Sequence, residues 1–301
     1  MNAQFGQFPA PRSVVVHLSD PHFLADGAYL YGTLDTDAVL TTALQRIEES
    51  ALRPDIIVVT GDIADKGEAD AYRRIRSLVR PFAKRLGAEL IWVAGNHDER
   101  AAFRTHLLGE APSIRPLDHV ITVNGLRLVA LDTTVPGYHH GELDHEQLEW
   151  LRAVLSENAP RGTILAMHHP PIPTPIRLME ILELQRQDRL AEVLEGSDVR
   201  VILAGHLHYP TNGTFAGIPV SVAGAVCYTM DVAAPEGELL GLAGGQSFNL
   251  VQVYDDHIVH ANVPIARCEV ATRFDKNYLE QMESLDAAGR IQAFSRFADP
   301  V

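Results

Sequence analysis

Cysteine is scarce in this 301-residue sequence, and its scarcity excludes two kinds of protein. The two cysteines, Cys227 and Cys268, are too few for a disulfide framework or a cysteine-rich zinc cluster. We therefore expect both to be buried thiols of a protein that works in a reducing compartment.

Long apolar runs are also missing, as are the marks of an exported protein. No run approaches the roughly 18 residues that a membrane-spanning helix needs, so membrane association is not expected. Residues 1–12 lack the basic start and apolar stretch of a signal peptide, and we interpret them as a flexible arm. These absences predict a cytoplasmic protein.

Basic residues are few, with 25 Lys and Arg against 39 Asp and Glu, and the formal net charge is −14. This balance argues against a nucleic-acid polymer as a partner, because nothing indicates a basic surface that follows phosphates. A small anionic substrate is still compatible, because bound metal ions can reverse the potential locally. Internal repeats and low-complexity segments are absent as well.

The first hundred residues alternate between strands and helices. A helix is expected to start at Asp35, and a second carries an apolar face from Tyr72 to Phe82, where Pro81 is expected to kink or split it. Short connections in a β-α-β-α-β order predict a parallel sheet. The three buried strands of this order are expected at 13–18, 56–59 and 90–93.

The rest of the chain is richer in strands. Asn124-Gly125 is a strong hairpin signal, and Asp144 is a helix cap. The segment 225–246 is long, glycine-rich and irregular, and it either borders a site or is ordinary surface. The other expected elements are strands at 120–123, 127–131, 163–167, 199–203, 213–215, 218–222, 249–254 and 258–263, and helices at 178–194 and 279–297.

Five of the expected buried strands end in side chains that bind metal ions. Each ending taken alone is also typical of an ordinary turn or of a hydrogen-bonded histidine. Residues i and i+2 of a strand point the same way, so paired residues are expected to converge, and together the endings predict a metal site with N and O ligands. The endings are Asp20 and His22, Asp62, Asn96 with His97, His168, and His206 with His208.

The order of these endings carries a family resemblance, through the blocks Asp20-x-His22, Gly61-Asp62-x-x-Asp65, Gly95-Asn96-His97-Asp98, His168 and Gly205-His206-x-His208. From about Val14 to Val263 the sequence resembles the calcineurin-like metallophosphoesterase superfamily, and within it the class III cyclic-nucleotide phosphodiesterases of bacteria. The resemblance implies an α/β fold, a four-layer α-β-β-α sandwich of two mixed β-sheets flanked by helices. We expect that domain at 13–265, the arm at 1–12, and a C-terminal extension with a helix at 266–301.

The resemblance also implies a role for each residue of the blocks. One metal ion would be bound by Asp20, His22, Asp62 and His208. The second would be bound by Asn96, His168 and His206, with Asp62 bridging the two ions.

The same resemblance implies the catalytic and substrate-binding residues. His97 would be a catalytic residue that contacts the phosphoryl group, and the carboxylate of Asp65 would orient it. Substrate would also touch Asn96 and His208, whereas Asp98 is expected to contact backbone or support the site indirectly. His139 is a further candidate for substrate binding, with ordinary polar surface as its alternative.

The function that follows is a dinuclear-metal phosphodiesterase. It would hydrolyse 3′,5′-cyclic nucleotides, cAMP first and cGMP second, to nucleoside monophosphates by attack of a metal-bridging hydroxide. The alternatives are a broad-specificity phosphodiesterase acting on glycerophosphodiesters or 2′,3′-cyclic nucleotides, and a non-catalytic scaffold. Two ions of Fe, Mn, Zn or Co are the expected cofactors, a small phosphodiester is the expected ligand, and a homodimer is implied by the resemblance.

Overall fold

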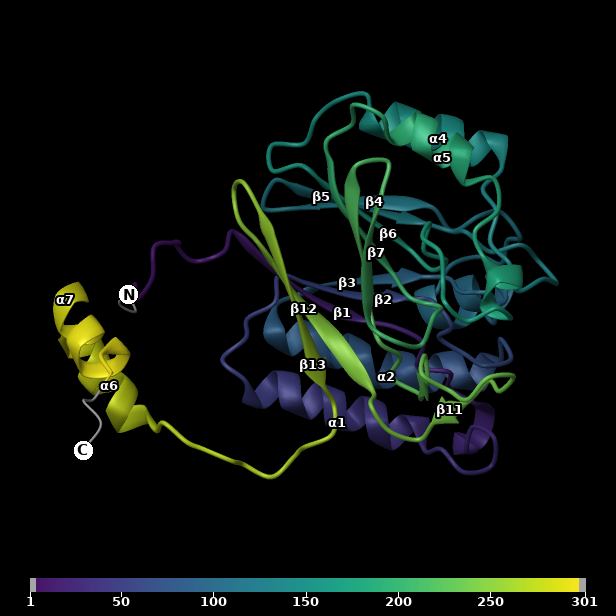
Figure 1. The fold of residues 1–301 in the computed structure, drawn as a ribbon. Coiled ribbons are helices and arrows are strands. Elements are labelled where there is room, and N and C mark those ends of the chain that lie inside the picture. Colours follow the sequence, from purple (N-terminus) through teal and green to yellow (C-terminus); the bar gives the residue numbers. More distant parts are fainter. Residues whose placement is uncertain (1–3, 298–301) are drawn as a thin grey trace. The chain divides into compact units, whose positions relative to one another are not determined.

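The structure is a computed structural model that describes residues 4–297 (Figure 1). The chain divides into two units, the larger formed by Arg12–Ala266 and the smaller by Met1–Pro11 with Arg267–Val301. No helix among the described residues is long and apolar enough to cross a membrane. The expected arm, domain and extension stay a prediction about how the chain is organised.

The first sheet of the larger unit is mixed and has five strands in the order β13-β12-β1-β2-β3. β1, β2 and β3 are parallel, as the sequence predicts, whereas β12 pairs antiparallel with both β1 and β13. The last two strands of the larger unit in sequence, β12 and β13, thus extend the sheet beside its first strand, β1. These strands are β1 (Ser13–Leu18), β2 (Ile56–Thr60), β3 (Glu89–Val93), β12 (Ser247–Val253) and β13 (Ile258–Pro264).

The second sheet is also mixed and has six strands in the order β4-β5-β6-β7-β9-β8. Its centre, from β5 to β9, is parallel, and an antiparallel strand closes each edge. The hairpin of β4 and β5 turns at Asn124 and Gly125, both at positive φ, as that dipeptide favours. The strands are β4 (His119–Val123), β5 (Leu126–Leu131), β6 (Thr163–Met167), β7 (Val199–Ala204), β8 (Thr211–Phe215) and β9 (Ile218–Val222).

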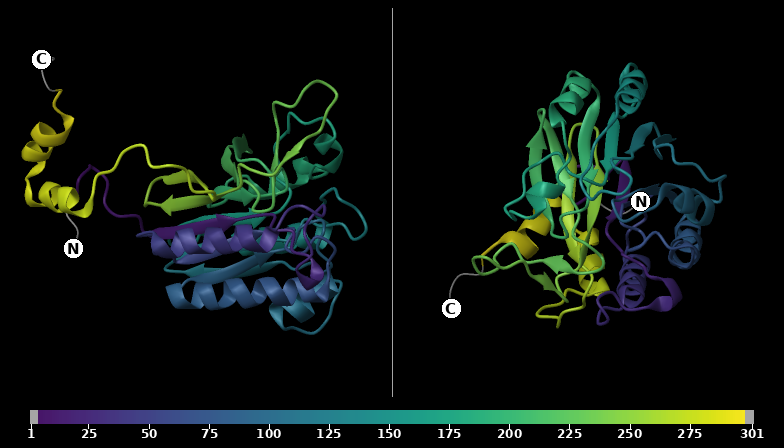
Figure 2. Two further views of the ribbon diagram at one scale, coloured as in Figure 1. Left: turned by 90° about the horizontal axis from the view of Figure 1, so that it is seen from below. Right: turned by 90° about the vertical axis from the view of Figure 1, so that its right-hand side faces the viewer.

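Helices cover the outer face of each sheet, so the larger unit has four layers. Figure 2 shows α1 (Thr36–Glu49) and α2 (Ala69–Leu86) side by side along the first sheet. On the second sheet lie α4 (His145–Leu155) and α5 (Gln187–Leu194), at the top of Figure 1. The expected four-layer α/β sandwich is confirmed.

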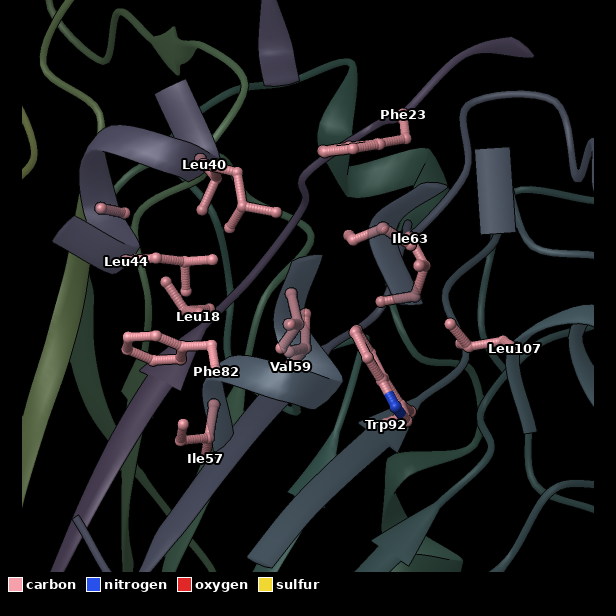
Figure 3. Close-up of a cluster of buried hydrophobic side chains, with 14 of the residues drawn as sticks. Leu18, Phe23, Leu40, Leu44, Ile57, Val59, Ile63, Phe82, Trp92 and Leu107 are labelled. Atoms are coloured by element: carbon pink, nitrogen blue, oxygen red, sulfur yellow. The ribbon is translucent and has the colours of Figure 1, made fainter. Parts of the chain in front are cut away.

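Three apolar cores hold these layers together. The core between the first sheet and its helices contains Leu18, Val59 and Trp92 from the strands and Leu40 and Phe82 from the helices (Figure 3). A second core lies between the other sheet and α4 and α5, and a third joins the two sheets face to face. Burying apolar area in this way supplies most of the favourable free energy of folding.

Helix boundaries follow local signals in most places, but Pro81 does not split its helix, which was one of the two expected effects. Asp35 caps α1 by accepting a hydrogen bond from the Ala38 backbone (3.0 Å). α2 continues through Pro81 without a break. Val79 and Phe82, on either side of the proline, are both buried in the core, and this packing compensates for the lost backbone donor.

The predicted helix at 178–194 is wrong in its first half. Only Met179–Leu182 forms a 3-10 turn before the chain extends at Glu183 and Leu184 bridges to Gly141. Arg186 then adopts a left-handed conformation, with φ +52°, and α5 starts after it. Tertiary pairing with the loop at Gly141 overrides the helical periodicity here.

Short elements fill the remaining connections. The segment 225–246 contains a two-stranded ladder, which its irregular composition does not predict. The ladder consists of β10 (Thr229–Met230) and β11 (Gly241–Leu242), and the other short elements are the 3-10 turns Ala25–Gly27 and Met179–Leu182, α3 (Arg100–Ala102) and the π-helical turn Phe103–Leu108.

The described part of the smaller unit contains two short helices in place of the single one predicted at 279–297. α6 (Lys276–Ser284) is followed by Leu285, whose backbone is extended. Asp286 then caps α7 (Ala287–Arg290) by accepting a hydrogen bond from the Gly289 backbone. A π-helical turn, Ile291–Ser295, follows α7. Cys268 also lies in this unit and is exposed, which corrects the expectation that both cysteines are buried, whereas Cys227 is buried as expected.

Candidate metal centre

The metal-binding side chains follow the carboxyl ends of strands from both sheets, but strand alternation is not what makes them converge. Asp20, His22, Asp62, His206 and His208 all lie beyond their strands in the left-handed region, with φ between +45° and +71°. This conformation is uncommon for residues other than glycine and marks stored strain. The expectation that residues i and i+2 converge is met, but it rested on strand geometry, whereas these residues lie in left-handed turns beyond the strands.

Hydrogen bonds between the turns hold these strained residues in place. The His22 backbone donates to the Asp62 carbonyl (2.9 Å), and the Asp20 backbone donates to the Gly61 carbonyl (3.1 Å). The Asp20 carboxylate in turn accepts from the His206 backbone at 3.1 and 3.2 Å. The turns after β1, β2 and β7 therefore form one interlocked unit.

The first group of side chains consists of Asp20, His22, Asp62 and His208, whose candidate ligand atoms all lie within 4.8 Å of one another. His22 Nε2 is 3.3 Å from both Asp62 Oδ2 and His208 Nε2. His208 Nε2 is 3.4 Å from Asp20 Oδ1. The four are buried and aim their nitrogen and oxygen atoms at a common point.

A second group shares Asp62 with the first. His168 Nε2 is 3.5 Å from Asp62 Oδ2 and 3.0 Å from Asn96 Oδ1. The His206 ring lies 5.0 Å from the His168 ring, and among the described residues its buried Nε2 has no hydrogen-bond partner. A buried nitrogen without a partner is costly unless a metal ion or another ligand satisfies it.

Hydrogen-bonding contacts outside the cluster determine which ring nitrogen of His168 and of His22 faces it. His168 Nδ1 donates to the Thr60 carbonyl (2.8 Å), and His22 Nδ1 contacts the Asp65 carboxylate (2.9 Å). In both rings this leaves Nε2 directed at the cluster, the arrangement that metal-binding histidines need. The donor atoms and their supports therefore fit a pair of transition-metal ions bound by nitrogen and oxygen.

The electrostatics of the cluster favour cations. Burial alone would raise the pKa of Asp62, but contacts with His168 and His22 outweigh it and hold that pKa well below its usual value. Burial likewise lowers the pKa of His168, but Asp62 and Asp20 raise it to about 9. A field that keeps a buried imidazole protonated also attracts divalent metal ions.

His97 lies beside the cluster, and its closest contact with Asp65 is to the backbone carbonyl, not to the carboxylate that was expected to orient it. Its Nδ1 donates to the backbone carbonyl of Asp65 (2.7 Å), and the Asp65 carboxylate is 3.7 Å away. That carboxylate makes its close contact with His22 instead. The His97 side chain is 31% exposed and its ring is 4.8 Å from the His22 ring, so it borders the cluster and reaches solvent.

His139 reaches the same place from the loop after β5. Asn96 Nδ2 donates to His139 Nδ1 (2.9 Å), and the His139 ring lies 4.9 Å from the His97 ring. The hydrogen bond orients the amide so that Asn96 Oδ1 faces the cluster. All ten residues singled out from the sequence as site candidates are therefore close to one another.

Three further residues contact the turns and side chains of the site without being proposed ligands: Asp98, His169 and Cys227. Asp98 accepts hydrogen bonds from the Gly95, Ile63 and Ala64 backbones and from the Tyr72 hydroxyl, and so fixes the turns after β2 and β3. Both ring nitrogens of His169 are engaged, by Thr133 Oγ1 and by the His139 carbonyl. Cys227 Sγ is 3.6 Å from His208 Nδ1, a contact that no local pattern predicts, because 19 residues separate the two.

A two-sheet sandwich with this donor set belongs to the class of metal-dependent phosphoesterases. The chain belongs to the calcineurin-like phosphoesterase family, whose model matches residues 13–210. The resemblance deduced from the five blocks is thereby confirmed, and so is the expectation of a metal-dependent enzyme acting on phosphate esters.

Three known proteins illustrate the range of the likeness. The cAMP/cGMP dual specificity phosphodiesterase of Mycobacterium tuberculosis is 53% identical over 89% of this chain and 84% of its own length. Glycerophosphodiester phosphodiesterase GpdQ of Enterobacter lignolyticus is 29% identical over 69% of this chain and 77% of its own. A dimetal phosphatase from Danio rerio superposes with a TM-score of 0.60 at 18% identity, covering 85% of this chain and 97% of that one, which shows a shared fold.

Proposed function

We propose that this protein is a dinuclear-metal phosphodiesterase that hydrolyses 3′,5′-cyclic nucleotides, cAMP and cGMP, to nucleoside monophosphates. The observation that carries the proposal is the convergence of two metal-binding groups on the shared Asp62, with His97 beside them. The choice of substrate follows the 53% identical relative, whose name specifies both nucleotides.

The metal ligands follow from the two groups. Asp20, His22, Asp62 and His208 would hold one ion, and Asp62, Asn96, His168 and His206 would hold the other. When bound, the two ions supply Lewis-acid catalysis and a water of lowered pKa. Fe, Mn, Zn and Co all suit such nitrogen and oxygen donors.

His97 is the proposed proton donor to the leaving alkoxide oxygen. A carbonyl oxygen only accepts, so the contact with the Asp65 carbonyl keeps the proton on His97 Nδ1 and leaves Nε2 to exchange protons with substrate. The Asp65 carboxylate lies 3.7 Å from the same nitrogen. A general acid in such a position contributes about 10²–10⁴-fold to the rate.

Asn96 and His139 would position the phosphoryl group together with His97, whereas both ring nitrogens of His208 are already engaged, Nε2 at the metal cluster and Nδ1 with Cys227. Asn96 and His139 are hydrogen-bonded to each other and border His97, so they form one face of the space in front of the cluster. A pair of oriented donors there would hold the phosphoryl oxygens as charge develops in the transition state.

Broad-specificity hydrolysis of glycerophosphodiesters or 2′,3′-cyclic nucleotides is the second candidate, and the likeness to a glycerophosphodiester phosphodiesterase favours it. A scaffold without catalysis is less well supported, because every ligand position of the family pattern is filled. A cytoplasmic location and a homodimer stay predictions from the sequence.

A hydrolysis panel on protein reconstituted with Mn²⁺, Fe²⁺ or Zn²⁺ tests the proposal. The substrates are cAMP, cGMP, 2′,3′-cyclic AMP, a glycerophosphodiester and a phosphomonoester. We expect the highest kcat/KM for the 3′,5′-cyclic nucleotides. Preference for the glycerophosphodiester would favour the second candidate, and inactivity on every substrate with all three metals would favour the scaffold.

The variant Asp62→Ala tests the dinuclear site itself. It removes the ligand that both groups share, so we expect metal content by elemental analysis and activity to fall together. Asp256→Ala, which changes a carboxylate that is 84% exposed, is the matched control and should keep both. Unchanged metal content in Asp62→Ala would contradict the proposed site.

A further inference from the structure

A cavity of about 400 Å³ lies beside the metal-binding cluster, between the segment 24–32 and the start of the loop after β2. Asp65 lines the cavity, and its carboxylate also contacts His22, a proposed metal ligand, at 2.9 Å. No role assigned above uses this space. We call it the Tyr31 pocket, and its principal lining residues are Leu24, Tyr29, Leu30, Tyr31, Lys66 and Glu68.

Two of the residues that line the Tyr31 pocket are fixed by packing in an apolar cluster. Leu24 and Leu30 are buried and pack with Ala225 and Cys227, while Tyr228 lies against the same cluster. The Glu68 carboxylate accepts a hydrogen bond from the Ala25 backbone (3.0 Å), which ties the two sides of the pocket together. A pocket that combines apolar and aromatic walls with a few charged groups, here Asp65, Lys66 and Glu68, is typical of a small-molecule site.

Tyr31 forms an aromatic rim that the fold does not need for stability. Its side chain is 71% exposed, and its backbone is held at φ +52° by the paired bonds between Leu30 and Leu34. Backbone strain of this kind clusters at ligand-binding sites, and an exposed ring is free to contact a ligand.

Tyr228 connects this rim to the proposed metal site. The Tyr31 and Tyr228 rings meet edge to face at 5.7 Å, with their hydroxyl oxygens 3.4 Å apart. The Tyr228 ring in turn lies 4.5 Å from the ring of His208, a proposed ligand. One aromatic series therefore leads from the place where phosphate would bind to the exposed edge of the pocket.

We propose that the Tyr31 pocket binds the purine base of the substrate, with the Tyr31 ring stacking on the base. This inference rests on the proposed function and adds the group that selects nucleotides over other diesters. A glycerol headgroup has no aromatic face and gains nothing from Tyr31, whereas every base offers one. At about 400 Å³ the pocket is near the lower end of the usual size of ligand sites, which suits a single base.

The test compares two ligands that differ only in the base, AMP and ribose 5-phosphate. Calorimetry on the Mn²⁺-reconstituted protein measures the affinity of both, independently of catalysis. We expect the wild type to bind AMP more tightly than ribose 5-phosphate. Tyr31→Leu should weaken AMP about 5- to 100-fold, as loss of one stacked base predicts, and leave ribose 5-phosphate and metal content unchanged.

Tyr31→Phe is the matched control, because it keeps the ring and removes only the hydroxyl contact with Tyr228. It should retain most of the AMP affinity and the KM for cAMP, whereas Tyr31→Leu should raise that KM with little change in kcat. Equal affinity of the wild type for AMP and ribose 5-phosphate would overturn the inference, as would an equal loss of both ligands in Tyr31→Leu.

Failure of this inference and failure of the proposed function give different results. If cAMP is hydrolysed but Tyr31→Leu leaves AMP binding unchanged, the function stands and the Tyr31 pocket does not bind the base. If AMP binding depends on Tyr31 but cAMP is not hydrolysed, the pocket stands and the cyclic substrate is wrong.

Discussion

Two atoms of Asp65 serve two different histidines. The carboxylate contacts His22 Nδ1 at 2.9 Å, and the backbone carbonyl accepts from His97 Nδ1 at 2.7 Å. Side-chain substitutions at Asp65 therefore disturb a proposed metal ligand more than the proposed proton donor. The two histidines can be separated experimentally on this basis.

We predict that Asp65→Ala weakens metal binding by about 10- to 100-fold, the usual effect of removing a partner of a metal-binding histidine. Excess Mn²⁺ should restore most of the activity, because the carbonyl that holds His97 is still present. Metal titration of cAMP hydrolysis measures both effects. Activity that stays low at saturating metal would show that the carboxylate acts chiefly on His97.

His97→Ala should behave in the opposite way. We expect kcat to fall by about 10²–10⁴-fold with both metal ions retained and no rescue by excess metal. Steady-state kinetics with elemental analysis measures the two outcomes, and His145→Ala at the start of α4 is the control. Full activity in His97→Ala would show that the proposed proton donor lies elsewhere.

At the scale of secondary-structure elements, the turns after β2 and β3 pack against each other without room for a side chain. A methyl group at Gly95 would overlap the backbone nitrogen and the carboxylate of Asp62, and one at Gly61 would overlap the His168 ring. Gly61 also has a φ of +89°, which favours glycine. The two glycines let the carboxyl ends of neighbouring strands bring their ligands together.

Gly95→Ala is therefore expected to lower metal content and activity together, because the Asp62 backbone must shift to admit the methyl group. Elemental analysis and thermal unfolding measure the change. Gly244→Ala is the control, since a methyl group there meets open space at an ordinary backbone conformation. Normal metal content in Gly95→Ala would show that the turns are more compliant than their packing indicates.

The N-terminus of α4 is tied to the half-buried carboxyl group of Asp118. Asp118 accepts hydrogen bonds from the Asp132 backbone (2.7 Å) and from Gln147 Nε2 (3.0 and 3.1 Å). Gln147 also completes the capping box of α4 with Asp144. Burial raises the pKa of Asp118 to about 6, and the neighbouring charge of Asp132 adds to that rise.

This raised pKa predicts a pH dependence of stability. The folded protein binds the Asp118 proton more tightly than the unfolded chain, whose pKa is about 3.9. The stability that protonated Asp118 contributes to the folded protein is fully present below about pH 4 and is lost as pH rises to about 6. Relative to Asp118→Asn, the free energy of unfolding of the wild type should fall between those values, as urea unfolding at several pH values measures; parallel curves would contradict the assignment.

At the scale of the whole molecule, the proposed metal site joins the two sheets. Asp20, Asp62 and Asn96 follow strands of the first sheet, and His168 and His206 follow strands of the second. Metal ions bound by both sets would hold the sheets together at this edge, and only the folded chain assembles the full ligand set.

Removing the metal should therefore lower the melting temperature. A site filled at 100 times its Kd contributes about 2.7 kcal/mol, which corresponds to roughly 5 °C for a domain of this size. Calorimetry before and after chelation, and again after Mn²⁺ is restored, measures the shift. Asp62→Ala is the control and should not respond, and an unchanged melting temperature in demetallated wild type would contradict the link between the sheets.

Much of the fold could be read from local patterns. β1, α1, β6 and the hairpin at Asn124-Gly125 occur where the periodicity and the caps predict them. The errors occur where distant contacts decide, as at 178–194, where Leu184 pairs with Gly141, and at Pro81, where core packing maintains α2. Local propensity is a weak preference that tertiary contacts override.

The sequence by itself determined which residues gather at the site. The donors Asp20, Asp62, Asn96, His168 and His206 each follow a buried strand, and the carboxyl ends of parallel strands meet at one edge of a sheet. Residue identity and strand order are local properties of the chain, so they can be read without coordinates.

Only the tertiary structure decided how those residues are used. It assigned the carbonyl of Asp65 to His97, aimed Asn96 Oδ1 through His139, and brought Tyr31 to Tyr228 across 197 residues of sequence. These relations depend on left-handed turns and on contacts between segments far apart in the chain. Such contacts form only when the two sheets pack face to face, and for that reason no local pattern in the sequence encodes them.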